Sequence, residues 1–240
     1  MKRGLVVVIL LAIVALTACR SVLNPIKGNA VIDWVDFVKI NQKTYMGLHE
    51  AVLADPAAVL LDRVVGKVAF QVSDVVTNPE YRTQDGDAAF LAVGTELFKV
   101  KGYEDQSLIA AKDDRSIHGF RLYQVNDPDF QHMKFKDLEA VKVKRIEIYQ
   151  DAGSNELLHK IQDGPNIQKF TDLFVAGSKT PEYVPDQTQG DSIYYQMVFY
   201  TDQVMAYKIS LAYDGKHYYF SPGETHAISQ EIEQFIPKRG

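Results

Sequence analysis

The chain has 240 residues, of which 46% are hydrophobic and 24% charged, and its formal net charge is −5. This composition is typical of a folded, soluble body rather than a disordered one, and the acidic balance argues against a nucleic-acid partner. Cys19 is the only cysteine, so the sequence excludes an intramolecular disulfide, a thiolate metal cluster and, once Cys19 is modified, a catalytic thiol.

The N-terminus has the pattern of a secretory signal. Lys2 and Arg3 precede an apolar run from Gly4 to Leu16, and the segment then ends in Leu-Thr-Ala-Cys at Cys19. The apolar run is shorter than the roughly 20 residues that cross a bilayer. We therefore predict a signal peptide over residues 1–18 and a tether over 19–31, the latter carrying a proline, a glycine and no sustained period.

The Leu-x-Ala-Cys ending at Cys19 resembles the lipobox of bacterial lipoproteins. In that family the cysteine is diacylated on sulfur and becomes the first residue of the mature chain. The resemblance implies that Cys19 carries the lipid and that the protein lies on the extracytoplasmic face of the cell membrane. Loss of the signal peptide removes two basic residues and makes the net charge −7. An acidic domain is not attracted electrostatically to anionic lipid headgroups, so we expect the two acyl chains alone to attach the protein to the membrane.

Residues 32–126 carry the signature of a β-rich domain. Short alternating segments recur at spacings of roughly 8 to 12 residues, separated by turn residues, which favours a small barrel or sandwich. The segment 50–61 contains Pro56, which argues against one long helix there. The expected strands are 34–40, 44–46, 66–72, 88–93, 96–100, 107–111 and 119–125.

A charged connector over 127–142 leads to a second domain, residues 143–240. Its strands are expected at 143–150, 157–161, 192–200, 204–213 and 217–220. Helices are expected from Asn166 to Ala176 and from the cap Ser229 to Phe235. This order predicts an antiparallel sheet with two helices on one face, so the whole chain belongs to the α+β class.

A second resemblance covers residues 85–103, Asp-Gly-Asp-Ala-Ala-Phe-Leu-Ala-Val-Gly-Thr-Glu-Leu-Phe-Lys-Val-Lys-Gly-Tyr, with Phe-Arg-Leu-Tyr at 120–123. These segments resemble uncharacterised cell-envelope lipoproteins of Gram-positive, Bacillus-like bacteria. Those proteins have no assigned activity, so the resemblance implies an envelope location and no particular chemistry.

The motifs of metal and cofactor sites are missing from the sequence. Asp85-Gly86-Asp87 lacks the acidic spacing of a calcium loop and is better explained as a turn. His217 and His226 flank Glu224 but have no zinc-ligand spacing, and no glycine-rich phosphate loop is present. We predict neither a metal nor a cofactor.

The strands between 192 and 220 are rich in tyrosine. Because side chains alternate between the faces of a sheet, about half of these rings must point away from the helices. We predict that Tyr194, Tyr200, Tyr207 and Tyr218 contribute to a binding surface for a protein, glycan or peptide. Burial against the first domain, or cross-strand pairing of the rings, explains the same residues.

The leading hypothesis is a non-enzymatic, lipid-anchored envelope protein that acts by binding. One alternative is an envelope hydrolase whose polar residues meet only in the fold, among them His217, His226, Glu224 and Asp191. Another is capture of a small solute in a cleft between the domains near residues 126–142.

Overall fold

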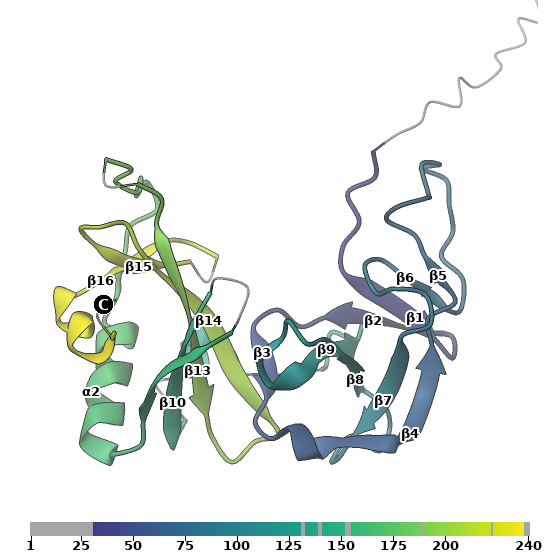
Figure 1. Ribbon diagram of the computed structural model, residues 1–240, viewed down its shortest axis with the longest axis horizontal. Coiled ribbons are helices and arrows are strands. Elements are labelled where there is room, and N and C mark those ends of the chain that lie inside the picture. Colours follow the sequence, from purple (N-terminus) through teal and green to yellow (C-terminus); the bar gives the residue numbers. More distant parts are fainter. Residues whose placement is uncertain are drawn as a thin grey trace, which may run out of the picture. The chain divides into compact units, whose positions relative to one another are not determined.

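The computed structural model describes residues 31–130, 133–138, 141–151, 155–188, 190–221 and 223–237. The predicted signal peptide 1–18, the lipidated Cys19 and the tether up to residue 30 lie outside the described residues. Residues 34–75 and 82–240 belong to one compact unit, which contains two β-sheets, A and B (Figure 1). The fold is α+β and dominated by strands, which confirms the predicted fold class.

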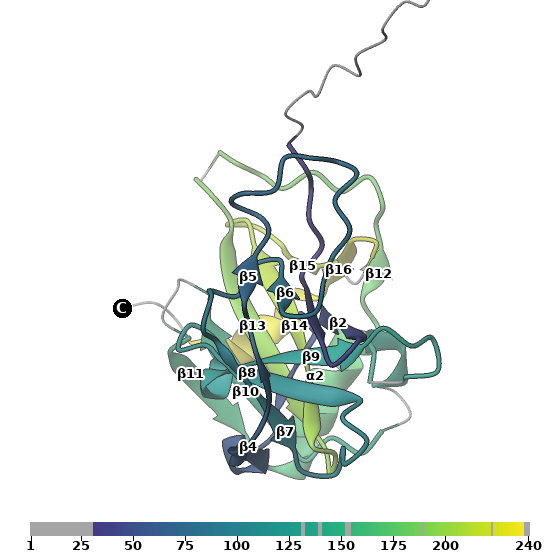
Figure 2. The ribbon, with the colours of Figure 1, turned by 90° about the vertical axis from the view of Figure 1, so that its right-hand side faces the viewer.

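Sheet A has eight strands in the order β4-β7-β8-β9-β2-β1-β6-β5, and all neighbours are antiparallel except β5 and β6. Figure 2 shows it from the side of β4, β7 and β8. The strands are β1 (Phe37–Ile40), β2 (Lys43–Gly47), β4 (Val59–Lys67), β5 (Phe70–Gln71), β6 (Asp87–Ala88), β7 (Glu96–Val100), β8 (Leu108–Lys112) and β9 (Phe120–Val125).

Sheet A curls until its edge strand β4 approaches β1. The approach is closest at Gly66, where an added Cβ would lie 2.5 Å from the Ile40 Cγ2 atom. Nearby, the side-chain amide of Asn41 donates to the Val65 carbonyl at 3.0 Å. The curl encloses apolar side chains of one face of the sheet, among them Leu97, Ile109 and the fully buried Tyr123. This curled sheet is the β-rich N-terminal part predicted from the strand spacing.

The predicted strands 34–40 and 44–46 meet in a hairpin, whereas the predicted strand 66–72 is interrupted. Asn41 and Gln42 adopt φ values of 51° and 64°, the left-handed conformation of a two-residue hairpin between β1 and β2. The predicted strand 66–72, in contrast, breaks after Lys67. The amide of Val68 donates to the Thr95 carbonyl, whereas Phe70 pairs with β6 and is 37% exposed. The strand changes partners there, so the alternation does not continue through it.

Sheet B is antiparallel, with the order β11-β10-β13-β14-β15-β16-β12 and β3 added on β14. Its strands are β3 (Ala51–Leu53), β10 (Arg145–Gln150), β11 (Leu157–Ile161), β12 (Ser178–Lys179), β13 (Ile193–Tyr200), β14 (Met205–Tyr213), β15 (Tyr218–Phe220) and β16 (His226–Ile228). The helices are α2 (Gly164–Val175) and the 3-10 helices η1 (Pro56–Ala58), η2 (Ile117–Gly119), η3 (Phe135–Asp137) and η4 (Gln230–Phe235).

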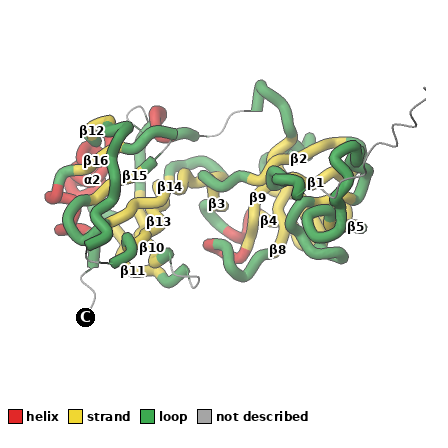
Figure 3. Tube along the Cα trace, turned by 90° about the horizontal axis from the view of Figure 1, so that it is seen from above, coloured by secondary structure: helices red, strands yellow, loops and turns green. Residues whose placement is uncertain are grey.

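Helix α2 lies on one face of sheet B (Figures 1 and 3). It begins two residues before the predicted start at Asn166, because Asp163 is the N-cap and accepts from the Asn166 amide at 3.0 Å, with Pro165 in the first turn. Its buried side chains, Phe170 and Phe174 among them, pack on the strands together with η4, so two helical segments cover this face as expected. Among the described helices, none has the length and apolarity needed to cross a bilayer.

Strand β3 joins the two halves of the chain. It pairs antiparallel with β14, with Leu53 opposite Met205 and Ala51 opposite Tyr207. Figure 3 shows β3 lying beside β14. The backbone amide of Lys208 continues this pairing by donating to the Glu50 carbonyl at 2.8 Å. The two predicted halves thus share a sheet, and residues of both line the pocket described next.

Candidate functional site

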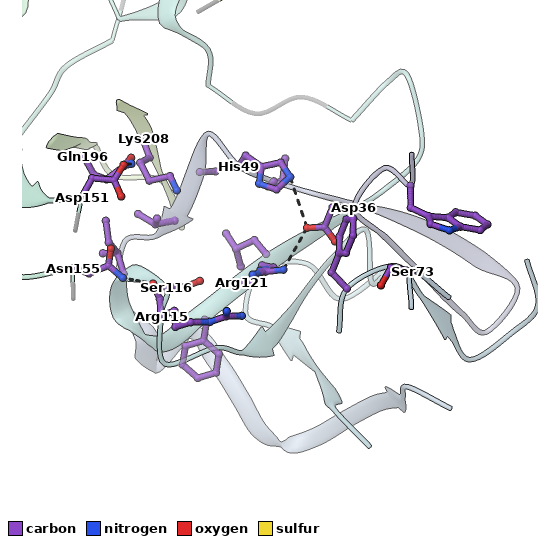
Figure 4. Close-up of a pocket in the computed structure, with 18 of the residues that line it drawn as sticks. Asp36, His49, Ser73, Arg115, Ser116, Arg121, Asp151, Asn155, Gln196 and Lys208 are labelled. Carbon is purple, nitrogen blue, oxygen red and sulfur yellow. Dashed lines mark hydrogen bonds and ion pairs between the residues drawn. The ribbon is translucent and has the colours of Figure 1, made fainter. Parts of the chain in front are cut away.

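A pocket of about 850 Å³ opens on the side of sheet B opposite α2 (Figure 4). Its walls come from residues far apart in the chain, including the turn before η2, strand β9, and the facing strands β13 and β14. Aromatic side chains contribute part of the wall. The polar and charged lining residues are Asp36, His49, Gln71, Ser73, Asp74, Arg115, Ser116, Arg121, Asp151, Asn155, Gln196 and Lys208.

Asp36 is the most deeply buried charged group of the pocket. It precedes β1, and its side chain is only 4% exposed. Its Oδ1 atom accepts from the Tyr123 hydroxyl at 3.1 Å. Its Oδ2 atom lies 3.6 Å from Arg121 Nη1 and 3.7 Å from His49 Nε2, so it attracts both groups without a hydrogen bond to either. The carboxylate therefore lies between the Arg121 guanidinium and the His49 imidazole at the pocket wall.

Gly47 provides the space that Asp36 occupies. A Cβ atom at this position would lie 2.4 Å from Asp36 Oδ2 and 2.7 Å from its Cγ. The Gly47 amide also donates to the Asp36 carbonyl at 2.9 Å, which fixes the backbone of the two residues against each other. Glycine is required here by steric exclusion, because any side chain would displace the carboxylate.

Arg121 on β9 is held between two carboxylates. Its Nη2 atom donates to Asp113 Oδ2 at 2.9 Å, while Nη1 faces Asp36. Asp113 also accepts from the backbone amide of Arg115 at 3.1 Å, within the turn between β8 and η2. The Arg121 side chain is 25% exposed and lines the pocket.

The opposite wall is the outward face of sheet B. Strand alternation turns Tyr195 and Met197 toward α2 and leaves Gln196 on the pocket side. The Gln196 amide donates to Asp151 Oδ2 at 2.5 Å and to Ser210 Oγ at 2.9 Å. The amide and the carboxylate of this wall are therefore already satisfied by each other.

Lys208 is the exception on this wall. It lies on β14 between the buried Tyr207 and Ile209, is itself half-buried, and points into the pocket with Gln196 (Figure 4). Among the described residues, no hydrogen bond or ion pair reaches its ammonium group. Burial lowers the pKa of Lys208, and the positive charge of Arg121 lowers it further, whereas Asp151 acts in the opposite sense.

A second cavity of about 400 Å³ adjoins this pocket and shares His49, Gln196 and Lys208 with it. Tyr194 lines the second cavity and is 46% exposed. Lys208 thus stands where the two cavities meet, and the second cavity is formed by side chains of β13, β14, β15 and the segment before β3. A site of this size and polarity suits reversible binding of a polar ligand.

The predicted tyrosine surface is not formed by the four residues together. Tyr200, Tyr207 and Tyr218 expose only 3%, 1% and 4% of their area, so none of them can touch a partner. Tyr207 and Tyr218 face the helices. Tyr200 faces the other way, but its hydroxyl donates to the buried Glu147 at 2.7 Å. Packing explains these three residues, and only Tyr194 is accessible.

The residues of the hydrolase alternative do not converge. His226 Nδ1 lies 3.2 Å from the Gly177 carbonyl oxygen, Glu224 pairs with Lys179, and the backbone amide of His217 donates to Asp214. No hydrogen bond or ion pair joins any two of His217, His226, Glu224 and Asp191 in the described structure. Within the same residues, no group of three or more His, Cys, Asp or Glu is placed to hold a metal ion.

Sequence reasoning missed Asp36, Arg121, His49 and Lys208. The solute-capture alternative expected a cleft between the domains near residues 126–142. None of those residues lines this pocket, whereas Leu138, Val141 and Lys142 line a separate cavity of about 410 Å³ beside α2. One signal was present in the sequence, because Lys208 is the only charged residue of strand β14. Nothing local, however, indicates that Lys208 faces Arg121.

Gly47→Ala should destabilise the fold by roughly 1–3 kcal/mol, because the methyl group forces the buried Asp36 carboxylate out of its place. Urea denaturation of the variant and the parent chain measures this difference. Gly164→Ala is the matched control, since a Cβ there meets no atom within 4 Å. Equal stability of Gly47→Ala and the parent would contradict the steric role of Gly47.

Lys208→Met should raise the stability at pH 7 by about 1 kcal/mol, because it removes a half-buried ammonium that no ion pair or hydrogen bond from the described residues reaches. The folded pKa of Lys208 lies below its unfolded value of about 10.4. The unfolded state therefore binds more protons between the two values, and the parent should gain stability as the pH rises through that window. The Lys208→Met variant should not show this rise in stability with pH.

Urea denaturation between pH 7 and 10.5 measures both effects. Lys101→Met serves as the control, since Lys101 is exposed and lines neither cavity. A Lys208→Met chain that is less stable than the parent at pH 7 would show that the ammonium is compensated in the folded state.

No protein family model, curated protein or solved structure matches the chain.

Proposed function

We propose that this protein is a lipid-anchored component of the bacterial cell envelope that acts by binding a ligand rather than by catalysis. The observation that carries the proposal is the 850 Å³ pocket in which no hydrogen bond or ion pair from the described residues reaches the Lys208 ammonium group. A partly buried charge destabilises the folded state unless another group pairs with it. Such a charge, with no hydrogen bond or ion pair among the described residues, is typical of a functional site. The pocket is therefore the proposed binding site.

The anchor is proposed from the N-terminal sequence. Leu-x-Ala-Cys at Cys19 follows a basic start and a short apolar run. Two acyl chains on one cysteine suffice for stable attachment to a membrane, so neither a basic patch nor an amphipathic helix is needed. The binding domain would then stay within reach of envelope components on the extracytoplasmic face.

Peptides and glycans suit the proposed pocket better than an apolar small molecule. Its lining combines amides and hydroxyls, such as Gln196, Asn155 and Ser116, with aromatic walls. Phe90 is 46% exposed at the wall and offers a flat apolar surface to a sugar or a side chain. A protein partner could insert a peptide segment into the same space.

Cys19→Ser should move the protein from the membrane fraction to the soluble fraction without changing its urea midpoint, because it removes the acyl acceptor and touches none of the described contacts. Fractionation of cells that express each form, followed by carbonate extraction, measures the distribution. Ser21→Ala is the control. A Cys19→Ser chain that remains membrane-bound would contradict the anchoring proposal.

Muropeptides released from purified cell walls should raise the thermal unfolding midpoint of the full chain in non-ionic detergent in a concentration-dependent manner, since a ligand of the native state stabilises it. Ser116→Trp should abolish the shift by filling the pocket. Thr188→Trp, an exposed change that lines neither cavity, should keep it. A shift that survives Ser116→Trp would place the binding elsewhere.

A further inference from the structure

Two carboxylates of the pocket, Asp74 and Asp151, already accept hydrogen bonds, whereas the ammonium group of Lys208 has none from the described residues. Asp74 accepts from the side chains of Gln71 and Ser73 at 3.1 and 2.9 Å. Asp151 accepts from Gln196. The donors are neutral side chains. These hydrogen bonds therefore occupy oxygen atoms of the two carboxylates without pairing either carboxylate with a cation. Among the described groups of the lining, Lys208 is left as a charge with no hydrogen bond or ion pair.

Lys208 also faces a second cation across the pocket. Arg121 lies on β9 of sheet A and Lys208 on β14 of sheet B, and both line the same cavity. Arg121 is oriented by Asp36 and Asp113, so it cannot move away from Lys208 without losing two ion pairs. Two cations held toward one cavity attract an anion, because a shared negative group removes both the desolvation cost and the repulsion.

The charge of that anion is limited by the rest of the lining. Three aspartates, Asp36, Asp74 and Asp151, line the pocket with two arginines and one lysine, so the formal charges of these groups cancel. A dianion such as a phosphate monoester would meet three carboxylates and gain little from a balanced site. A single negative charge placed beside Lys208 is repelled less, and a carboxylate has that charge at neutral pH.

We propose that the ligand presents a carboxylate group, which the Lys208 ammonium binds on the side of the pocket that faces Arg121. This inference rests on the proposed binding function and names its ligand class. The remaining volume of the pocket would hold the uncharged part of the ligand. Two sources supply such a group in an envelope, the free end of a peptide and an acidic sugar.

Matched pairs of probes test the inference by isothermal titration of the full chain in non-ionic detergent. The peptide pair is N-acetyl-trialanine and its C-terminal amide, and the sugar pair is trigalacturonic acid and its methyl ester. Glucose 6-phosphate provides the phosphate arm. In each pair only the carboxylate differs, so a preference for the acid isolates the charge, and the pair that shows it identifies the source.

The acid of one pair should bind at least about tenfold more tightly than its neutral partner, as expected for a charge-assisted hydrogen bond. Lys208→Met should remove this preference, and Lys101→Met should preserve it. The Lys208→Met chain is expected to fold, and its urea midpoint verifies that any loss is not due to unfolding.

Three outcomes would overturn the inference. They are equal binding or no binding for both members of each pair, tighter binding of glucose 6-phosphate than of either acid, and an acid preference that persists in Lys208→Met. Equal binding of neutral and acidic probes that is abolished by Ser116→Trp would leave the proposed binding function intact. Failure of the proposed function is distinct, since it would appear as membrane retention of Cys19→Ser or as muropeptide shifts insensitive to Ser116→Trp.

Discussion

The pairing of β3 with β14 is the interaction on which the rest of the architecture depends. Residues 212–213 of β14 pair with β15, while residues 205–207 along the same edge pair with β3. Without β3 the latter groups would form an open sheet edge. Leu53 of β3 is fully buried with Met205 in a core that also contains residues of β8 and β9. The pairing therefore joins both sheets through backbone hydrogen bonds and apolar burial together.

The same pairing creates the pocket. Because β3 pairs with β14 beside Tyr207, the preceding residues His49 and Glu50 lie next to Lys208, whose backbone amide donates to the Glu50 carbonyl. Asp36 then reaches His49 from the start of β1. A short strand of three residues thus decides which charges from the curled sheet meet the outward face of sheet B.

Two buried charged groups on sheet B show the difference between a structural and a binding role. Burial by itself raises the pKa of Glu147, but hydrogen bonds from the Tyr149 and Tyr200 hydroxyls and the charge of Arg145 hold it below its usual range. Its negative charge is fully used by the fold. Lys208 has no comparable partner among the described residues, and a ligand can supply one.

The sequence alone determined the class of the fold, the strands on either side of residues 41–43 and a helix over most of residues 164–176, because each depends on residues close together in the chain. The acidic charge balance follows from the composition. The sequence also carries the lipobox pattern at Cys19, on which the proposed location rests. Only the tertiary structure decided that three of the four tyrosines are buried and that Asp36, Arg121 and Lys208 line one pocket. Alternation shows which residues share a face of a strand, but the strand order and the partner of that face are set by contacts between distant segments, which no local pattern encodes.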